Sequence, residues 1–520
     1  MKRILFAFMG VLGLLMAFSC TGNPNKVCTL HVKETQIPVI IGKTDNVLFH
    51  LEVDAKKEVE VQSVDIQFGK SLDTLFLKSV SLVRTGAGTQ PDSLLCRVPV
   101  TSQKVRLTCA STLPQGKSTL KIVVAVDAQA DVYSTFTASL SQVRVNKSNV
   151  NAVVTSPKDI VHRLAIALRH ANDQGVSVYR IPGLTTTNQG TLLAVYDIRY
   201  NGVKDLQEHI DIGLSRSTDG GRTWGPMQIV MTREGYGGLP LNQNGTGDPC
   251  ILYDTQKKTA WIAAWWTHGM PDAVAWLTSG PGMSPQKTGQ LLVVKSTDDG
   301  CTWSEPVNLT SMVKKPSWRV LLQGPGRGIT TSDGVLVFPI QYKDSTGTPM
   351  AGIMYSKDHG ARWSLSAPAR SNTTESQVVE LPDGSLMLNM RDNRGGSRAV
   401  STTRNWGRTW EEHPTSRKAL PEPVCMASLL SVKAAENQTG QDLLFFSNPN
   451  TDHAPRCRTT LKMSLDNGLT WLPKHQILLD EGENWGYSCL TLVDANHIGI
   501  LYESSQAHIT FQVIPIAAFF

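Results

Sequence analysis

The carboxylates that recur in a repeated motif are the first residues that could carry out chemistry. Asp219, Asp298 and Asp466 each stand in a Ser-x-Asp-x-Gly-x-Thr-Trp motif, and weaker copies surround Asp358 and Asn405. Repeated acids could act as general acids or bases. In this motif, however, Asp can accept backbone N–H bonds two residues on, Gly allows a tight turn, and Trp packs between sheets. We therefore interpret the motif as a hairpin-fixing element.

The cysteines and histidines do not have the spacing of metal ligands. The nine cysteines form no Cys-x-x-Cys pair, the twelve histidines are scattered, and the Asp motifs differ from an EF-hand loop. We expect no metal and no organic cofactor. An oxidising compartment would allow a disulfide, for instance of Cys28 with Cys96 or Cys109, but the sequence does not choose a pairing. Most of the cysteines should be small buried hydrophobes.

A second motif gives the repeats a more specific meaning. Val178-Tyr-Arg-Ile-Pro182 precedes the first copy. From about Ile166 to Tyr502 the chain resembles the sialidase superfamily, in which a Phe/Tyr-Arg-Ile-Pro motif opens a β-propeller that carries repeated Asp boxes. The resemblance implies an exo-α-sialidase. Such an enzyme hydrolyses terminal sialic acid from glycoproteins, glycolipids or oligosaccharides, with retention through a tyrosyl-enzyme intermediate.

Sialic acid carries a carboxylate on its anomeric carbon, so the enzyme must hold an anion throughout the reaction. Arginine suits this task because its planar fork offers paired N–H donors and stays charged. The resemblance implies that three arginines bind this carboxylate. By match to the family motifs, they are Arg180, Arg391 in Leu388-Asn-Met-Arg-Asp-Asn, and Arg456. Arg458, on the same face of the predicted strand, is the alternative to Arg456. The position of Arg456 relative to the last Asp box, ten residues before Asp466, favours Arg456.

The same carboxylate disfavours an Asp or Glu nucleophile, because the two negative charges would repel each other. Most glycosidases use two carboxylates, and sialidases are an exception that uses a tyrosine nucleophile. Trp485-Gly-Tyr-Ser-Cys-Leu490 resembles the family's tyrosine segment, which makes Tyr487 the nucleophile. A phenol has a pKa near 10, so it needs a base, and Glu375 would accept its proton. Glu380 is the rival, which we interpret as a strand-end residue before the turn at 382–384.

The general acid should be Asp205, which lies in a loop and would protonate the leaving oxygen and then activate water. Asp211, in a predicted strand, and Asp197, at a strand end, are the alternatives. Arg199 resembles a residue beside the carboxylate and 4-hydroxyl subsite, and Asp248 one near the N-acetyl subsite, although both could be structural. Aromatic and Met residues of the 262–285 loop could contact the acyl or leaving group, or pack in the core: Trp265, Trp266, Met270 and Trp276.

A closed repeat architecture would bring these widely separated residues together. The five motif copies, with Trp-to-Trp intervals of 47 to 79 residues, suit one four-stranded blade each, and the unmarked remainder would form a sixth blade. We predict an all-β fold whose residues 160–520 form a six-bladed β-propeller. Loops of different blades converge at one end of its axis, where the site should lie.

Residues 27–150 show a different pattern, of short strands separated by turns, which predicts a β-sandwich. This region resembles the N-terminal module of bacterial gut sialidases. It would serve as a carbohydrate-binding module or as a spacer that packs on the propeller. The predicted strands are 28–34, 47–53, 59–68, 74–83, 93–98, 104–109, 118–126 and 132–145.

Residues 1–20 predict an export signal, because two basic residues precede an apolar stretch too short to span a bilayer. The signal resembles the lipoprotein type, in which Cys20 would be lipidated, and the polar segment 21–26 would act as a tether. Ala17 and Ser19 also fit ordinary cleavage, which stays open. We expect an exported protein in the periplasm, or a lipoprotein of the outer membrane or cell surface.

The formal net charge of +6 is spread over 520 residues, and no block of Lys and Arg indicates nucleic-acid binding. The expected partners are sialylated glycans, and we expect a monomer. The alternative function is a non-catalytic, lectin-like propeller that binds sialosides. Such a protein would need the arginines, but not Tyr487, Glu375 and Asp205 together.

Overall fold

The computed structural model describes residues 27–69, 76–157, 160–269 and 273–520. The predicted export signal with Cys20 lies outside these residues, as does Met270. The described chain consists mostly of strands, and no helix in it is long and apolar enough to cross a membrane. The helices are α1 (Ala275–Thr278), α2 (Thr310–Val313) and the 3-10 turns η2 (Asp173–Gly175), η3 (Tyr236–Gly238), η4 (Leu241–Gln243), η5 (Ala434–Glu436), η6 (Pro473–His475) and η7 (Ile516–Phe519).

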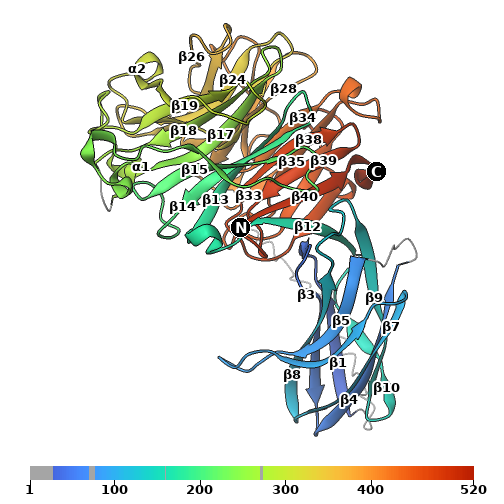
Figure 1. The fold of residues 1–520 in the computed structure, drawn as a ribbon. Helices are drawn as coiled ribbons and strands as arrows, with labels where there is room; N and C mark the ends of the chain where they lie inside the picture. The colour runs from blue at the N-terminus through green and yellow to red at the C-terminus, as the bar shows by residue number, and fades with distance from the viewer. Residues whose placement is uncertain (1–26, 70–75, 158–159, 270–272) are drawn as a thin grey trace, which may run out of the picture.

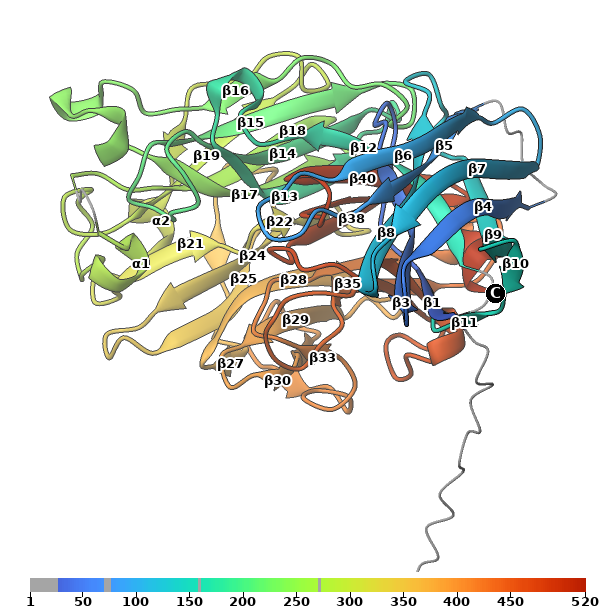
Figure 2. The ribbon, with the colours of Figure 1, turned by 90° about the horizontal axis from the view of Figure 1, so that it is seen from below.

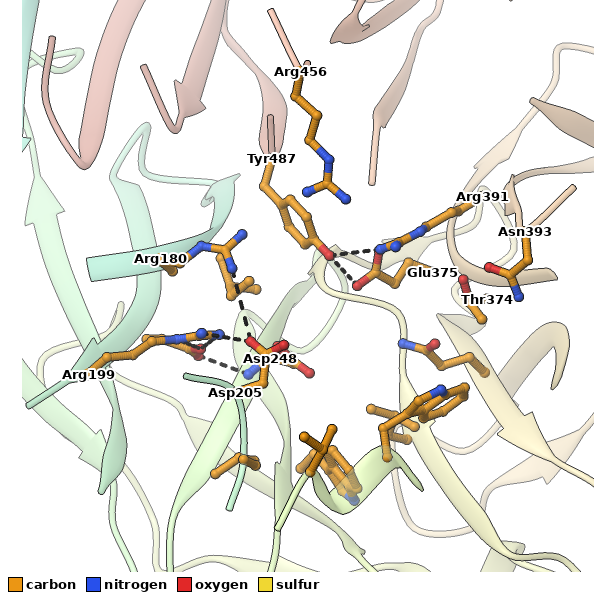
Figure 3. A pocket seen from close by; sticks show the side chains of 18 residues that line it. Arg180, Arg199, Asp205, Asp248, Thr374, Glu375, Arg391, Asn393, Arg456 and Tyr487 are labelled. Carbon is orange, nitrogen blue, oxygen red and sulfur yellow. Dashed lines mark hydrogen bonds and ion pairs between the residues drawn. The ribbon is translucent and has the colours of Figure 1, made fainter. Parts of the chain in front are cut away.

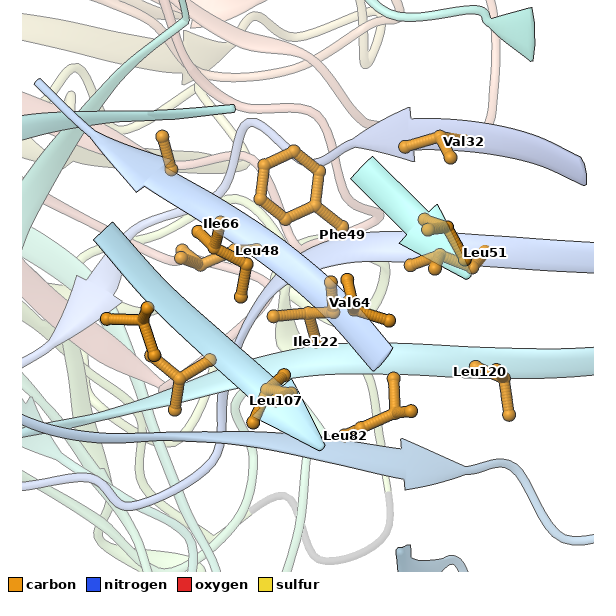
Figure 4. Packing of buried hydrophobic residues seen from close by; sticks show 14 of the residues in the cluster. Val32, Leu48, Phe49, Leu51, Val64, Ile66, Leu82, Leu107, Leu120 and Ile122 are labelled. Carbon is orange, nitrogen blue, oxygen red and sulfur yellow. The ribbon is translucent and has the colours of Figure 1, made fainter. Parts of the chain in front are cut away.

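The N-terminal region is a β-sandwich, as predicted (Figure 1). Alternate residues of its strands point inward, and Leu48, Leu51, Val64 and Ile122 meet in a core from which water is excluded (Figure 4). One sheet has the order β11 (Ala152–Val154), β1 (Cys28–Glu34), β3 (Asn46–Ala55), β8 (Gly116–Val126), β5 (Leu77–Arg84) and β6 (Ser93–Pro99). The facing strands are β9 (Thr135–Val145), β4 (Val59–Phe68) and β7 (Lys104–Leu113), with β10 (Ser148–Val150) beside β9.

A disulfide joins the two sheets of the sandwich. It links Cys96 of β6 to Cys109 of β7, whose Cα atoms are 5.7 Å apart. Cys28, which the sequence suggested as a partner for either residue, is instead buried in the sandwich core. The pairing depends on which strands border each other across the two sheets, and the cysteine spacing does not contain that information.

The rest of the described chain forms the predicted propeller, whose six blades surround a common axis. Their strands are short and largely buried, with turns between them. Blade 1 is β13 (Val178–Thr186), β14 (Leu192–Arg199), β15 (Ile210–Ser217) and β16 (Gln228–Met231); blade 2 is β17 (Thr246–Asp254), β18 (Thr259–Trp266), β19 (Gln290–Ser296) and β20 (Val307–Asn308), with β22 (Gly326–Arg327) paired to β17. Blade 3 is β21 (Val320–Gln323) and β23 (Ile329–Thr330) on β24 (Leu336–Lys343), then β25 (Pro349–Ser356), β26 (Ser364–Leu365) and β27 (Arg370–Ser371).

Blades 4 and 5 follow the same pattern, and blade 6 closes the ring with strands from both ends of the propeller sequence. Blade 4 is β28 (Thr373–Glu380), β29 (Leu386–Asp392), β31 (Ala399–Thr403) and β32 (Glu411–Glu412), with a side pair β30 (Gly396–Ser397) and β33 (Pro421–Glu422). Blade 5 is β34 (Ser428–Val432), β35 (Leu443–Pro449), β36 (Thr459–Ser464) and β37 (Gln476–Asp480). Blade 6 is β38 (Ser488–Asp494), β39 (His497–Tyr502), β40 (Ile509–Pro515) and β12 (Val161–Arg169), on which β2 (Val39–Ile40) also pairs.

The strand β12 also connects the two regions. It pairs with β40 on one side and with β9 of the sandwich on the other, so one ladder runs from blade 6 into the sandwich (Figures 1 and 2). Next to it, the Tyr133 hydroxyl donates to the Gly220 carbonyl at 2.9 Å, and the Arg222 guanidinium lies 4.1 Å from the Tyr133 ring centre. The sandwich is thus joined to the propeller by backbone pairing as well as by side chains.

The Asp motifs occupy the turn between the third and fourth strands of blades 1 to 5, and none of them lines the cavity described below. In the first copy, Asp219 Oδ1 accepts from the Thr223 N–H at 3.0 Å and from the Ser217 hydroxyl at 2.7 Å. The backbone bond thus spans four residues rather than the expected two. Such bonds lower the pKa of Asp298 to about 2, so this acid is ionised. Most motif tryptophans are only partly buried, the exception being Trp363.

Candidate active site

A cavity of about 300 Å³ opens at one end of the propeller axis, where residues from all parts of the propeller sequence meet (Figure 3). It contains all eight residues that the sequence predicted for catalysis and substrate binding. They are Arg180, Arg199, Asp205, Asp248, Glu375, Arg391, Arg456 and Tyr487. The roles of these residues are taken up below as a proposal.

The three predicted carboxylate-binding arginines converge, but they differ in their protein partners. Arg180 donates to Glu503 at 3.0 and 3.3 Å, and Arg391 donates to Glu375 at 2.6 Å. Within the described part of the chain, Arg456 donates only to the carbonyls of Trp485 and Val424, both at 2.8 Å. Neutral partners leave the charge of Arg456 uncompensated, and Arg391 Nε is buried without a partner in the described chain. The cluster therefore has donors and positive charge to offer an anion.

The structure distinguishes Arg456 from its sequence alternative. Arg456 lines the cavity with its guanidinium 5.9 Å from the Tyr487 ring centre. Arg458 is exposed, lies outside the cavity lining, and adopts a left-handed backbone with φ of 61°. That conformation interrupts the strand alternation on which the expectation of a shared face was based.

Tyr487, Glu375 and Arg391 form a compact hydrogen-bonded group. The Tyr487 hydroxyl donates to Glu375 Oε1, and Arg391 donates to the same hydroxyl at 3.2 Å. The phenol is only 7% exposed. Burial, together with the Glu375 charge, raises the pKa of Tyr487 well above its usual value, although Arg391 and Arg180 oppose the shift. The phenol is therefore neutral in the ligand-free protein, with a carboxylate in place to take its proton.

Glu503 is a site residue whose role the sequence analysis missed. Its side chain is fully buried, and besides Arg180 it accepts from the backbone N–H groups of Ile181 at 3.1 Å and Tyr487 at 3.0 Å. It thus joins blade 1 to blade 6. Ile181 has φ of 60°, a conformation unfavourable for a β-branched residue that four such bonds can hold in place. Arg180 and Ile181 belong to a different blade, so no local sequence pattern indicated these contacts.

A second buried ion pair lies behind Arg391 and also escaped the sequence analysis. Arg398 donates to Glu422 at 2.7 Å and to the Cys425 carbonyl at 2.6 Å, and both charged side chains are fully buried. Glu422 accepts from the Asp392 N–H at 2.7 Å. The pair therefore connects the strand of Arg391 to the segment whose Val424 carbonyl holds Arg456. Nothing in the local sequence marks these contacts, which join residues 24 to 30 positions apart within blade 4.

The opposite side of the cavity holds the predicted acid. Asp205 stands on the loop between β14 and β15, where its carboxylate accepts from Arg199 at 2.7 Å and lies 4.0 Å from Arg180. Its side chain is 69% exposed, although neighbouring protein atoms still crowd the carboxyl group. This crowding favours the neutral acid, but the attraction of Arg199, with that of Arg180 and Arg391, outweighs it and lowers the pKa of Asp205. Asp205 is therefore ionised in the ligand-free protein.

The alternatives to Asp205 and Glu375 have other partners. Asp197 is fully buried and accepts from Arg199 at 2.8 and 3.0 Å. Asp211 is 3% exposed and lies outside the cavity lining. Glu380 pairs with Lys433 at 2.8 Å in a second cavity, at the far end of β28.

Asp248 stands next to this acidic group. Its backbone has φ of 58°, and its N–H donates to Asp197 at 2.8 Å. Burial, with the negative charges of Asp197 and Asp205, raises the pKa of Asp248 well above its usual value. Its carboxyl group accepts no hydrogen bond from the described residues, so it is available to a ligand.

The aromatic loop divides between the site and the core. Trp265 and Trp276 line the cavity, whereas Trp266 packs between blades 1 and 2. Gln341, Thr374 and Asn393 also line it, and the sequence analysis did not single them out. Thr374 and Asn393 border Glu375 and Arg391, so their proximity to predicted residues was the available signal. Within the described ranges, no group of three or more His, Cys, Asp or Glu side chains could hold a metal ion.

Comparison with known proteins agrees with this geometry. Residues 190–502 match the model of a BNR repeat-like domain, and residues 28–95 match the N-terminal domain of BNR-repeat neuraminidase. A sialidase of Clostridium perfringens is 29% identical over 69% of this chain and 95% of its own. The structure of the Hadza microbial sialidase Hz136 superimposes with a TM-score of 0.90 at 46% identity, over 94% of this chain and 99% of that one.

More distant structures share the fold. The Trypanosoma rangeli sialidase gives a TM-score of 0.55 at 22% identity, over 69% of this chain and 56% of its own.

A Bacteroides fragilis sialidase is 50% identical over 94% of this chain and 95% of its own length. On the strength of that match and of the repeat domain, this chain belongs to the sialidase family.

Proposed function

We propose that the protein is an exo-α-sialidase that removes terminal sialic acid by hydrolysis with retention. The observation that carries this proposal is the Tyr487–Glu375 hydrogen bond inside a cluster of three arginines. A lectin would need the arginines to bind a sialoside, but it would have no use for a buried phenol paired with a base. A cavity of about 300 Å³ that opens at one end of the propeller also suits one terminal sugar better than an internal chain segment.

The arginines would bind the substrate carboxylate. Arg456 and the unpartnered Nε of Arg391 offer donors that the protein does not itself satisfy. Arg199 and Asp248, on the other side of the cavity, would bind the ring hydroxyl and amide substituents. A neutral Asp248 could donate as well as accept a hydrogen bond. The anomeric carbon would then lie between Tyr487 and Asp205.

In the first step, the Tyr487 oxygen attacks the anomeric carbon while Glu375 takes the phenolic proton. The glycosidic bond breaks, and its oxygen receives a proton from Asp205. Asp205 must therefore become protonated in the complex. Arg180 and Arg391 help to keep it ionised in the free protein, so a bound carboxylate that neutralises them would raise its pKa.

In the second step, the same groups act in reverse. The Asp205 carboxylate takes a proton from water, whose oxygen attacks the anomeric carbon from the side that the leaving group vacated. The bond to Tyr487 breaks, and Glu375 returns the proton to the phenolate oxygen. Two displacements at one carbon give net retention.

Release of a fluorogenic aglycone from an α-sialoside tests the reaction, with Tyr487→Phe as the control. We expect turnover by the unaltered protein and a loss of at least ~10³-fold in the variant, because a nucleophile has been removed. With a 2,3-difluorinated sialic acid, the Tyr487 oxygen should displace the anomeric fluoride, so that a 3-fluorosialyl group is added to Tyr487 in the unaltered protein only. A protein that binds sialyllactose but releases nothing would support the lectin instead.

Export and lipidation at Cys20 form a further part of the proposal, supported by the basic and apolar pattern of residues 1–20 and by the Cys itself. We also propose that the protein is a monomer. Metabolic labelling with a fatty acid should mark the unaltered protein but not Cys20→Ala. An exported but unlabelled protein would indicate ordinary cleavage. Light scattering of the mature protein measures its oligomeric state.

A further inference from the structure

The propeller has a second cavity at the other end of its axis. Its volume is about 400 Å³, and it is lined by the far ends of strands whose near ends line the active site. In β13, for example, Arg180 lines the first cavity and Thr186 the second, and in β28 Glu375 and Glu380 are divided in the same way. The two cavities therefore lie at opposite ends of the propeller axis, and we call the second one the second mouth.

Arg327 extends from β22 into this second mouth. Its Nη1 donates to the Leu490 carbonyl at 3.1 Å, and its Nε lies 3.5 Å from the Gly328 carbonyl. No carboxylate of the described residues is within ion-pair distance of this guanidinium. Burial lowers the pKa of Arg327, although the group remains charged at any physiological pH.

The other charged groups of the mouth do not neutralise Arg327. Lys433 pairs with Glu380 at 2.8 Å, and Glu380 also accepts from the Ser332 N–H at 3.0 Å. Glu436 accepts from the Lys433 N–H at 2.7 Å and faces the cavity beyond ion-pair distance of Arg327. The nearby thiols of Cys250 and Cys489 are neutral, because burial raises their pKa.

A buried charge without a partner is unfavourable, and proteins normally pair it or give it a ligand. Arg456 in the active site shows the same pattern, a guanidinium held only by carbonyl oxygens and facing a cavity. The hydroxyl groups of Thr255 and Ser431 also line the second mouth, and neither makes a side-chain hydrogen bond within the described chain. These groups offer further donors to an oxyanion.

We propose that Arg327 anchors a second anion site, which binds a small inorganic anion such as phosphate at the mouth opposite the catalytic site. The bond from Arg327 to Leu490 joins β22 to β38, and so connects blade 2 with blade 6. An anion bound to Arg327 would compensate the positive charge of its guanidinium. Binding would therefore stabilise the closed ring and would not require the sialidase reaction.

Thermal unfolding in a phosphate series tests the site, in an Arg456→Met background that weakens the catalytic arginine cluster. We expect the midpoint to rise saturably with phosphate, because a ligand bound only by the native state stabilises it. Adding Arg327→Met should abolish that rise, whereas adding Arg362→Met, a change at an exposed residue, should preserve it. An equal rise with and without Arg327 would overturn the proposal. A chloride series shows whether the site prefers an oxyanion.

Glu436 is the rival partner for Arg327, and Glu436→Gln tests it. A phosphate effect that appears only in this variant would mean that Glu436 already neutralises the arginine, which contradicts the proposal. An effect in both proteins supports it. A bromide-soaked crystal of the unaltered protein provides a test that needs no variant. An anomalous peak beside Arg327 supports the site, and a peak confined to the catalytic arginines overturns it.

Discussion

The two sides of the catalytic cavity are built differently. On one side, Tyr487, Arg180 and Arg391 stand on strands or directly beside them, and buried carboxylates hold them. On the other, Asp205 stands on a loop with 69% of its side chain exposed. The buried side holds groups that must keep a fixed geometry around an anion, which favours preorganised partners. The exposed side holds the group that must both give and take a proton, so its pKa must respond to the ligand.

The largest expected effect comes from removing the base on the buried side. Glu375→Gln leaves the shape of the site but cannot accept the phenolic proton, so kcat should fall by about 10²- to 10⁴-fold. Steady-state kinetics with a fluorogenic sialoside measure the change. Glu380→Gln is the matched control, since Glu380 lies at the opposite mouth. Equal losses in the two variants would show that Glu375 has been assigned the wrong role.

The ion pair behind Arg391 tests whether the buried side depends on its supports. Arg398→Met leaves the buried Glu422 without its charge partner, which should lower the free energy of unfolding by about 3–5 kcal/mol. KM should also rise, because the segment that holds Arg456 loses its anchor. Urea denaturation and steady-state kinetics measure the two effects.

The double variant Arg398→Met/Glu422→Leu separates positioning from stability. Replacing both charges with apolar groups should recover most of the free energy of unfolding, but the raised KM should remain. Arg216→Met, which breaks an Arg216–Asp299 pair of 3.1 Å outside the cavity lining, is the matched control. A double variant with normal KM would mean that the pair contributes only to stability.

Asp205→Asn should have a smaller effect, which depends on the substrate. A poor leaving group, such as the sugar of sialyllactose, needs protonation and should react about 10²-fold more slowly. An aryl leaving group needs little help and should be affected much less. The free energy of unfolding should hardly change, because exposed ion pairs contribute little. Equal losses with both substrates would argue against an acid role.

The sequence was informative where a short segment carried the information. The repeated Asp motifs predicted the blades, and the segments around Arg180, Arg391 and Tyr487 predicted residues that the structure brings into one cavity. The Asp motifs combine a residue type with a local backbone requirement, so they can be interpreted without knowing the fold. The segments around Arg180, Arg391 and Tyr487 were identified by their resemblance to the sialidase family.

The supports of the site could not be read in this way. Glu503 and Arg327 take partners from other blades, and the Arg398–Glu422 pair joins residues 24 positions apart in one blade. Which strands become neighbours depends on the closure of the ring. For the same reason the sequence suggested a role for Cys28 in a disulfide, whereas the structure pairs Cys96 with Cys109.

The smallest expected effect concerns Asp248 and is visible in stability against pH. Its raised pKa means that the native state keeps a proton which the unfolded chain loses near pH 3.9. The native state then binds more protons, so the free energy of unfolding should fall as pH rises above about 4, by at most about 1.4 kcal/mol per pH unit. Asp248→Asn cannot titrate and should lack this contribution.

Urea denaturation of both proteins at a series of pH values isolates the effect of Asp248, because every other titrating group is shared. The difference in the free energy of unfolding between Asp248→Asn and the unaltered protein should grow in favour of the variant from about pH 4 upward. A difference that stays flat would mean that Asp248 is ionised in the native state. The exposed side of the cavity would then carry one more negative charge, and a substrate carboxylate would have to overcome it.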